Sequence, residues 1–425
     1  MNGGFVSRVL VVGLDGVPYS FITKRAEEGK LPRFRELLLE GSIRRMRSVI
    51  PTVSSVAWST YMTGKNPGKH GIYGFIDRRP GTYEEYVPLS SDMKSDPLWE
   101  ILSNKRKRVV VINVPVTYPP RRVNGILISG FLAIKIEKAT YPREVADVLN
   151  RMGYRIDVDP WKAREGKIDE FLGDLDTTLE KRFEVAFRYM NEQSWDFFQL
   201  HVMGTDRINH FLWNSDTYSE RFLGYYRKID YYLGELKRRI DHDTTLVILS
   251  DHGFCAIEKE IDLNVWLRHN GYLSSTTAEP GRLVDIGPHS TAYSLPPGRI
   301  YAKDEKVREE IERGLTEWRD PDTGKKIVER VFKRHELYEG EMLNAGPDLV
   351  AHPYNGFDLK ASFKKKDSVS TRTPIVGMHT YDDAFIYIRG KHIEKENPAI
   401  VDVMPTILGL LEVDPPDDID GSDCV

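Results

Sequence analysis

Two short segments each carry an aspartate and a histidine at spacings that suit metal coordination. Asp251 and His252 are adjacent, one residue after the apolar run TLVIL, and Gly253 follows them. Because the chain leaves its pleat at a strand end, both side chains can turn into one pocket. Asp206 and His210 are four residues apart, which places them on the same face of a helix. Each pair is also compatible with a helix-capping aspartate beside an exposed histidine.

Three further residues lie where the chain is expected to turn. Asp15 follows the apolar run RVLVVGL, and His379 lies in GMHTY, just before the run AFIYI. Ser54 belongs to the hydroxyl-rich segment PTVSSVAWSTYMTG. Their ordinary interpretations are a turn-forming aspartate, a loop histidine and a helix-capping serine. A hydroxyl at a helix N-terminus can also face a bound anion together with free N–H groups.

The six acidic and imidazole side chains are more informative together than singly. Three aspartates and three histidines provide three ligands for each of two divalent ions, and each ion keeps an open position, as in catalytic sites. Two ions about 4 Å apart can clamp the attacking and leaving oxygens of an in-line displacement at phosphorus, and a serine bound to one ion becomes a nucleophile. The predicted ligands are Asp15, Asp206, His210, Asp251, His252 and His379.

Alternating apolar runs and helical patterns indicate the elements that position these residues. We expect buried strands at residues 8–14, 109–114, 197–202, 245–249 and 384–388, and helices near 20–28, 32–40, 168–191 and 219–239. This alternation predicts an α/β fold with a mostly parallel central sheet and helices on both faces. Three of the strands end in polar clusters, where ligands bind in open α/β sheets.

Two regions differ from the expected core in composition. We expect residues 1–257 and 348–425 to form the catalytic core, with residues 77–165 as a variable insertion rich in Pro, Arg and Lys. Residues 258–347 are less apolar and are predicted to form an inserted cap subdomain, after which the chain returns to the core at residues 348–351. The acidic end DPPDDIDGSDCV is expected to be loosely ordered.

The composition is that of a globular protein without a strong electrostatic partner. The 425 residues include 60 Lys and Arg against 64 Asp and Glu, a formal charge of −4. This balance does not favour a stable complex with nucleic acid or an anionic membrane. The two cysteines, Cys255 and Cys424, are too few for a disulfide framework. We see no signal peptide or membrane-spanning run and expect a cytoplasmic protein.

The order of these motifs resembles the alkaline phosphatase superfamily, and within it the type I phosphodiesterase/nucleotide pyrophosphatase family. The resemblance rests on Asp15, PTVSS, Asp206-x-x-x-His210, Asp251-His252-Gly253 and His379, with the phrases TGKNPGKHGI and VDVMPTIL. It covers residues 8–75, 196–254 and 377–411. It implies an alkaline-phosphatase-like fold and a metal-dependent phosphoester hydrolase that works through a phosphoseryl intermediate.

The resemblance also assigns roles by position. It places Asp15, Asp251 and His252 on the ion that binds the nucleophile, and Asp206, His210 and His379 on the other ion. It places the nucleophile three residues after Pro51, at Ser54, with Ser55 as the alternative. Many nucleotide pyrophosphatases have Thr as the nucleophile and Asn three residues later, whereas this chain has Ser54 and Ala57. This departure bears on the substrate more than on the metal site. Lys65 and Lys69 are candidate helpers for the phosphate.

Other functions remain open at this point. One alternative is a phosphomonoesterase or a cofactor-independent phosphoglycerate mutase of the same superfamily, for which Arg268, Arg282 and Arg299 provide basic groups in the inserted segment. Another is a non-catalytic metal-binding protein. The nucleophile segment lacks the C/S-x-P-x-R pattern of sulfatases, and GKNPGKH lacks the spacing of a P-loop. We expect Zn²⁺, with Mn²⁺ as the alternative, and a small phosphoester substrate, nucleotides included.

Overall fold

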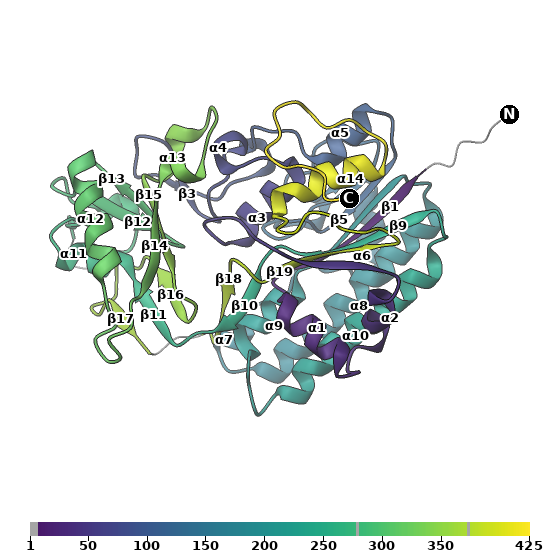
Figure 1. Cartoon of the computed structure of the whole chain (residues 1–425), viewed down its shortest axis with the longest axis horizontal. Coiled ribbons are helices and arrows are strands. Elements are labelled where there is room, and N and C mark those ends of the chain that lie inside the picture. Colours follow the sequence, from purple (N-terminus) through teal and green to yellow (C-terminus); the bar gives the residue numbers. More distant parts are fainter. Residues whose placement is uncertain (1–6, 278–279, 372–374) are drawn as a thin grey trace.

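A large sheet with helices on both faces forms the body of the molecule, and a smaller β-rich subdomain projects from one end (Figure 1). The structure is a computed structural model and describes residues 7–277, 280–371 and 375–425. Its helices are α1 Tyr19–Glu27, α2 Pro32–Leu38, α3 Ser54–Thr63, α4 Pro67–His70, α5 Leu98–Asn104, α6 Val145–Met152, α7 Trp161–Arg164, α8 Ile168–Glu192, α9 Gly204–Leu212, α10 Ser219–Arg239, α11 Leu263–His269, α12 Glu305–Glu317, α13 Arg334–Leu337 and α14 Val403–Leu410.

The central sheet has eight strands in the order β2-β19-β9-β1-β8-β5-β6-β7. The strands are β1 Arg8–Leu14, β2 Gly41–Met46, β5 Val109–Ile112, β6 Gly125–Ile128, β7 Thr140–Tyr141, β8 Phe197–Val202, β9 Thr244–Ser250 and β19 Ala384–Arg389. The five from β9 to β6 are parallel, and antiparallel strands flank them on both sides. The predicted α/β fold with a mostly parallel central sheet is confirmed.

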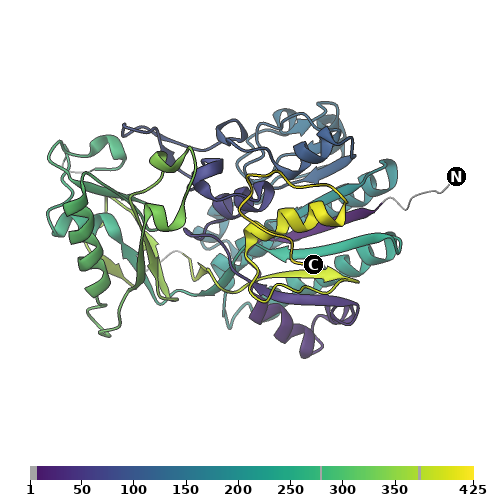
Figure 2. The ribbon, with the colours of Figure 1, turned by 45° about the horizontal axis from the view of Figure 1, so that its top comes forward.

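The sequence of β1 explains why both faces of the sheet are covered. Leu10, Val12 and Leu14 belong to one buried cluster, which includes residues of α1, α2, α8 and α10. Val9 and Val11 belong to the other, which includes residues of α3, α5 and α14. Successive side chains of a strand point to opposite faces, so an apolar residue at every position requires a core on each side. Figure 2 shows the two helical layers on either side of the sheet.

The second body is larger than the sequence indicated. Its strands are β11 Lys259–Asp262, β12 Ala292–Leu295, β13 Arg299–Ala302, β14 Val328–Lys333, β15 Leu349–Pro353, β16 Phe357–Lys360 and β17 Val369–Ser370. Because β15 pairs with β13 and β14, the predicted return to the core at residue 348 is wrong. The subdomain extends to about residue 370 and has its own hydrophobic core.

Residues 77–165 are not a separate insertion either. After the short ribbon β3 Asp77–Arg78 and β4 Glu85–Tyr86, this segment contributes β5, β6 and β7 to the central sheet. The expected loose end of the chain also differs, because Cys424 is buried and its carbonyl accepts a hydrogen bond from the Glu394 N–H at 2.8 Å. The two cysteines are free thiols.

A two-stranded ribbon joins the subdomain to the core. The chain leaves the core through β10 Gly253–Ala256 and returns through β18 Gly377–Thr380, and the two strands pair antiparallel with Phe254 opposite His379. Within the described residues, no helix is both long and apolar enough to cross a membrane.

Candidate active site

The carboxyl ends of β1 and β9 bring three of the predicted ligands together. The strands are parallel neighbours with Gly13 opposite Leu249, so Asp15 and the Asp251–His252 pair emerge at the same edge of the sheet. Their ligand atoms lie within 4.8 Å of one another. All three side chains are 0 % exposed. We call these residues the buried cluster.

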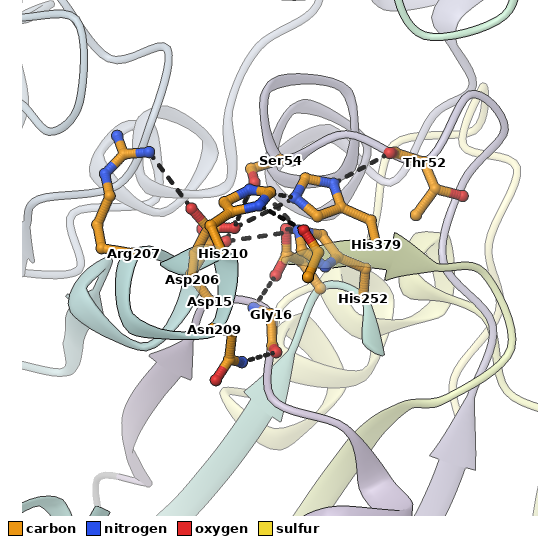
Figure 3. Close-up of polar contacts among 12 residues, drawn as sticks. Asp15, Gly16, Thr52, Ser54, Asp206, Arg207, Asn209, His210, His252 and His379 are labelled. Carbon is orange, nitrogen blue, oxygen red and sulfur yellow. Dashed lines mark hydrogen bonds and ion pairs between the residues drawn. The ribbon is translucent and has the colours of Figure 1, made fainter. Parts of the chain in front are cut away.

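The other three predicted ligands meet beside the buried cluster (Figure 3). Asp206 and His210 lie one turn apart on α9, and His379 lies on β18. The His379 Nε2 atom is 3.2 Å from Asp206 Oδ1 and 3.1 Å from His210 Nε2. The side chains are 4 % exposed for Asp206, 21 % for His210 and 14 % for His379. We call these residues the open cluster.

Backbone carbonyls orient all three histidines of the two clusters. The Nδ1 atom of His210 is 2.9 Å from the Gly377 carbonyl, that of His379 is 3.2 Å from the Thr52 carbonyl, and that of His252 is 3.0 Å from the Gly253 carbonyl. Because a carbonyl only accepts hydrogen bonds, each Nδ1 must donate, and each Nε2 presents a lone pair to the site. This is the usual arrangement of metal-binding histidines.

Ser54 lies against the buried cluster at the first residue of α3. Its Oγ is 3.0 Å from Asp15 Oδ1 and 3.2 Å from His252 Nε2, and the residue is 2 % exposed. The alternative nucleophile, Ser55, has a buried Oγ with no hydrogen-bond partner among the residues that the structure describes. The geometry therefore favours Ser54 over Ser55.

Two residues that the sequence analysis did not select donate hydrogen bonds to Asp15 on the side away from Ser54. Its Oδ2 accepts hydrogen bonds from Trp58 Nε1 at 2.8 Å and from His201 Nε2 at 3.0 Å, which leaves Oδ1 to face Ser54 and His252. Trp58 lies on α3 and His201 on β8, and both are fully buried. A histidine inside the buried run FFQLHV was the available signal, since such a group needs a polar partner.

The two clusters differ in their electrostatics. Burial and then the nearby Asp15 raise the pKa of Asp251 well above its usual range, and burial lowers the pKa of His252 to about 3. Burial also acts to raise the pKa of Asp206, but His210 and His379 outweigh it and hold that pKa well below the usual range. In the metal-free protein the buried cluster thus disfavours the charged form of Asp251, whereas the open cluster favours the charged form of Asp206.

The side chains fit two cations. Asp251 Oδ2 is buried with no hydrogen-bond donor in the described part of the chain, and the nearest ring nitrogen, His252 Nε2 at 3.4 Å, faces it with a lone pair. The Nε2 atoms of His210 and His379 are 3.1 Å apart, and their lone pairs point toward each other. Such groups repel one another unless a positive ion lies between them.

A cavity of about 340 Å³ opens on the open cluster, between the core and the subdomain. Its lining includes Thr52 and Val53 next to the nucleophile, and His210 and His379. Most of the other lining residues are apolar: Ile50, Pro51, Phe75, Ile76, Pro160, Phe211, Pro296, Pro297, Ala351, Pro353, Leu359, Ile375 and Met378. The organic part of a substrate can therefore lie beside the metal centre, out of bulk water.

The lysines considered as phosphate helpers lie elsewhere. Lys65 forms an ion pair with Asp418, and Lys69 forms one with Asp420, so both hold the C-terminal segment. Neither lysine lines the cavity. A basic group that does contact the open cluster is Arg207, which lies 3.3 Å from Asp206 and 2.7 Å from Asp157.

Solved structures of other proteins share this fold over nearly their whole length. Phosphonoacetate hydrolase from Sinorhizobium meliloti 1021, in complex with phosphonoformate, has a TM-score of 0.69 at 17 % identity, with 96 % of each chain covered. Murine ectonucleotide pyrophosphatase/phosphodiesterase 5 has a TM-score of 0.60 at 15 % identity, with 96 % of each chain covered. The alkaline phosphatase PafA has a TM-score of 0.64 at 12 % identity, with 98 % of each chain covered.

The sequence comparisons identify the family. A comparison with curated proteins gave no match. The family model described as type I phosphodiesterase/nucleotide pyrophosphatase matches residues 9–382, which contain all seven predicted site residues and most of the chain. The chain therefore belongs to the type I phosphodiesterase/nucleotide pyrophosphatase family, a family of phosphoester hydrolases within the alkaline phosphatase superfamily.

Proposed function

We propose that the protein is a phosphodiesterase that cleaves small phosphodiesters at a two-metal centre, with Ser54 as its nucleophile. The observation that carries the proposal is the position of Ser54 Oγ, 3.0 Å from Asp15 Oδ1 in the buried cluster and close to the open cluster. The two carboxylate–imidazole clusters provide the two sites, three side chains each. Zn²⁺ is the expected ion and Mn²⁺ the alternative.

The chain's own residues account for the positioning in this mechanism. When bound, the ions lower the pKa of the serine hydroxyl and neutralise the charge that develops on the phosphoryl oxygens. Asp15 and His252 hold Ser54 Oγ at the N-terminus of α3. The first N–H groups of this helix are placed to donate to an incoming phosphate. The serine hydroxyl releases its proton to solvent as its oxygen bonds to phosphorus. The bond from phosphorus to the alcohol oxygen breaks, and the alcohol leaves with a proton from solvent. Water then cleaves the phosphoseryl enzyme and restores the hydroxyl.

The cavity favours a diester over the alternatives. A monoester needs no room for a second organic group, whereas about 340 Å³ of mostly apolar space adjoins the open cluster. A mutase must retain its product with several basic groups. The three arginines considered for this role do not line the cavity: Arg268 donates to the Phe363 carbonyl, Arg282 is exposed, and Arg299 is fully buried. Other basic residues, Arg164, Arg207 and Lys360, do line it, so the preference for a diester rests on the apolar space alone.

The neighbours suggest the range of substrates without fixing it. One related structure holds phosphonoacetate, and an inactive form of the murine ectonucleotide pyrophosphatase/phosphodiesterase 5 holds AMP. We propose a small phosphoester, nucleotides included, as the substrate of this chain. We also propose that the protein acts in the cytoplasm without a nucleic acid or membrane partner, in keeping with its formal charge of −4.

The first experiment compares hydrolysis of bis(p-nitrophenyl) phosphate with that of p-nitrophenyl phosphate. The protein is stripped with a chelator and resupplied with Zn²⁺ or Mn²⁺. We expect metal-dependent turnover that is faster on the diester. Ser54→Ala should lower kcat by at least about 10³-fold while the metal content stays unchanged. Faster monoester turnover would reassign the protein as a phosphatase, and bound metal without turnover would favour a metal-binding protein.

A further inference from the structure

One buried arginine of the subdomain contacts both walls of the cavity where they meet. Phe75 and Ile76, from the loop after α4, line the cavity from the core, and Pro296 and Pro297, between β12 and β13, line it from the subdomain. Arg299, the first residue of β13, lies behind this seam and is 0 % exposed.

All three nitrogens of the Arg299 guanidinium donate hydrogen bonds at the seam. Nη2 donates to the Ile76 carbonyl at 2.6 Å and to the Pro296 carbonyl at 2.8 Å. Nε donates to the Pro296 carbonyl at 3.2 Å, and Nη1 donates to Asp77 Oδ1 at 3.1 Å. Only the planar fork of arginine can bridge two carbonyls and a carboxylate in this way. Both walls are thus attached to one rigid group.

The core is shaped to receive this group. A Cβ atom on Gly74 would lie 2.4 Å from Arg299 Nη2, so the absence of a side chain at Gly74 makes room for the guanidinium. Asp77, the carboxylate partner, is buried, and burial raises its pKa against the opposing charge of Arg299. The Tyr301 hydroxyl also donates to Asp77 Oδ1, at 3.4 Å.

Other contacts attach the subdomain independently of Arg299. The Tyr73 hydroxyl donates to the Met342 carbonyl at 2.6 Å, and the Tyr338 hydroxyl donates to the Ile50 carbonyl at 3.1 Å. The β10–β18 ribbon continues the chain between the two bodies. Loss of Arg299 should therefore loosen the seam without releasing the subdomain.

We propose that Arg299 is a positioning residue that selects substrates by the bulk of their organic group. By fixing Ile76 against Pro296, it maintains an apolar wall that a bulky, largely apolar substituent of a phosphodiester contacts and that a small substituent does not reach. The inference rests on the proposed function, because it concerns the substrate of the same metal centre. Arg299 itself touches neither the metal clusters nor the cavity surface.

The test uses p-nitrophenyl phosphodiesters whose second substituent grows from methyl to phenyl to naphthyl, with the metal-loaded full-length protein. For Arg299→Met we expect kcat/KM for the naphthyl ester to fall by about 10-fold or more, mainly through KM, and the methyl ester to change by less than about threefold. Arg299→Lys should restore part of the loss. Gly74→Ala, which displaces the guanidinium and keeps its charge, should reproduce the selective loss.

Arg268→Met is the matched control, because Arg268 is a partly buried arginine of the same subdomain that donates to the Phe363 carbonyl within the subdomain. It should leave the selectivity unchanged. An equal loss on methyl and naphthyl esters, or no loss on either, would overturn the proposal.

A second measurement separates this inference from the proposed function. Hydrogen–deuterium exchange of residues 72–79 and 298–302 should rise in Arg299→Met and stay as in the wild type in Arg268→Met. A wild-type protein that hydrolyses no diester would end the phosphodiesterase assignment. Hydrogen–deuterium exchange would then still test whether Arg299 holds the two cavity walls together. Unchanged exchange in Arg299→Met would refute the role of Arg299.

Discussion

The buried and open clusters contain the same ligand types in different surroundings. The buried cluster, Asp15, Asp251 and His252, is closed to solvent and lies at the ends of two central strands. The open cluster, Asp206, His210 and His379, faces the cavity and takes its ligands from a helix and from the subdomain ribbon. Burial on a rigid sheet suits a permanent ion that holds the nucleophile, whereas exposure suits an ion that meets substrate, water and product.

The largest expected effect is on turnover. Asp251→Asn should lower kcat by at least about 10³-fold, and excess metal should not restore it, because the buried site then loses one of its two carboxylates. His379→Ala should also lose turnover, but millimolar Zn²⁺ should restore part of it, since Asp206 and His210 remain and the site is open. Measuring the metal content and kcat of both variants as a function of Zn²⁺ concentration would test this difference in rescue. Equal rescue of both variants would abolish the distinction between the clusters.

An intermediate effect, on metal affinity, is expected for a residue that supports the buried cluster without belonging to it. Trp58→Phe removes the indole donor to Asp15 Oδ2 but keeps an aromatic ring in the core. Loss of such an outer partner should weaken the affinity of the buried cluster for its ion by about 10- to 100-fold. Competition with a fluorescent chelator would resolve the two sites. A matched Trp99→Phe variant, on α5 in the same hydrophobic core, should leave both affinities unchanged, and a change at the open cluster instead would contradict the assignment.

The smallest effect concerns the metal-free protein, in which Asp251 and Asp206 should contribute to the free energy of unfolding with opposite signs. Because the folded-state pKa of Asp251 is raised, this group costs stability as pH rises above the ordinary carboxyl range. Because the folded-state pKa of Asp206 is lowered, this group adds stability above that range, and the contribution is lost as pH falls through the lowered value. At pH 7, Asp206→Asn should therefore lower the free energy of unfolding by about 1–3 kcal/mol.

Under the same conditions Asp251→Asn should leave the metal-free stability unchanged or raise it, since it removes a buried carboxyl group whose charged form the site disfavours. Thermal unfolding in the presence of a chelator, at pH 7 and at pH 4, would measure both variants. Destabilisation of similar size in the two would show that their surroundings are electrostatically alike.

The sequence predicted the core of the fold because that core is built on simple periodicities. The run RVLVVGL could only be a strand buried on both faces, and α8 and α10 follow the predicted helices within a few residues. The six ligands were predicted because each follows a strand, precedes one or lies on a short helix beside one, and the structure brings them into two groups of three. Whether they bind metal stays a prediction.

What the sequence did not reveal depends on contacts between distant segments. The subdomain boundary was wrong because residues 349–353 have the apolar pattern of a core strand, and only their pairing with β13 and β14 shows otherwise. Backbone groups were equally invisible: the Thr52 and Gly377 carbonyls that orient His379 and His210 carry no sequence signal. Arg299 was considered as one of the basic groups that a mutase would need, and in the structure it binds Asp77 and two carbonyl groups at the seam instead.

The ribbon between the two bodies links the cavity to the metal centre mechanically. His379 lies on β18, one of the two strands through which the chain passes between core and subdomain, and the Val376 N–H just before it donates to the His210 carbonyl at 2.7 Å. A rotation of the subdomain about this joint would move the predicted ligand His379 with it. A substrate that binds only when the subdomain meets the core, and an ion that binds only when His379 meets Asp206 and His210, would then favour the same arrangement. Thermodynamic linkage requires in that case that each strengthens the binding of the other by the same factor.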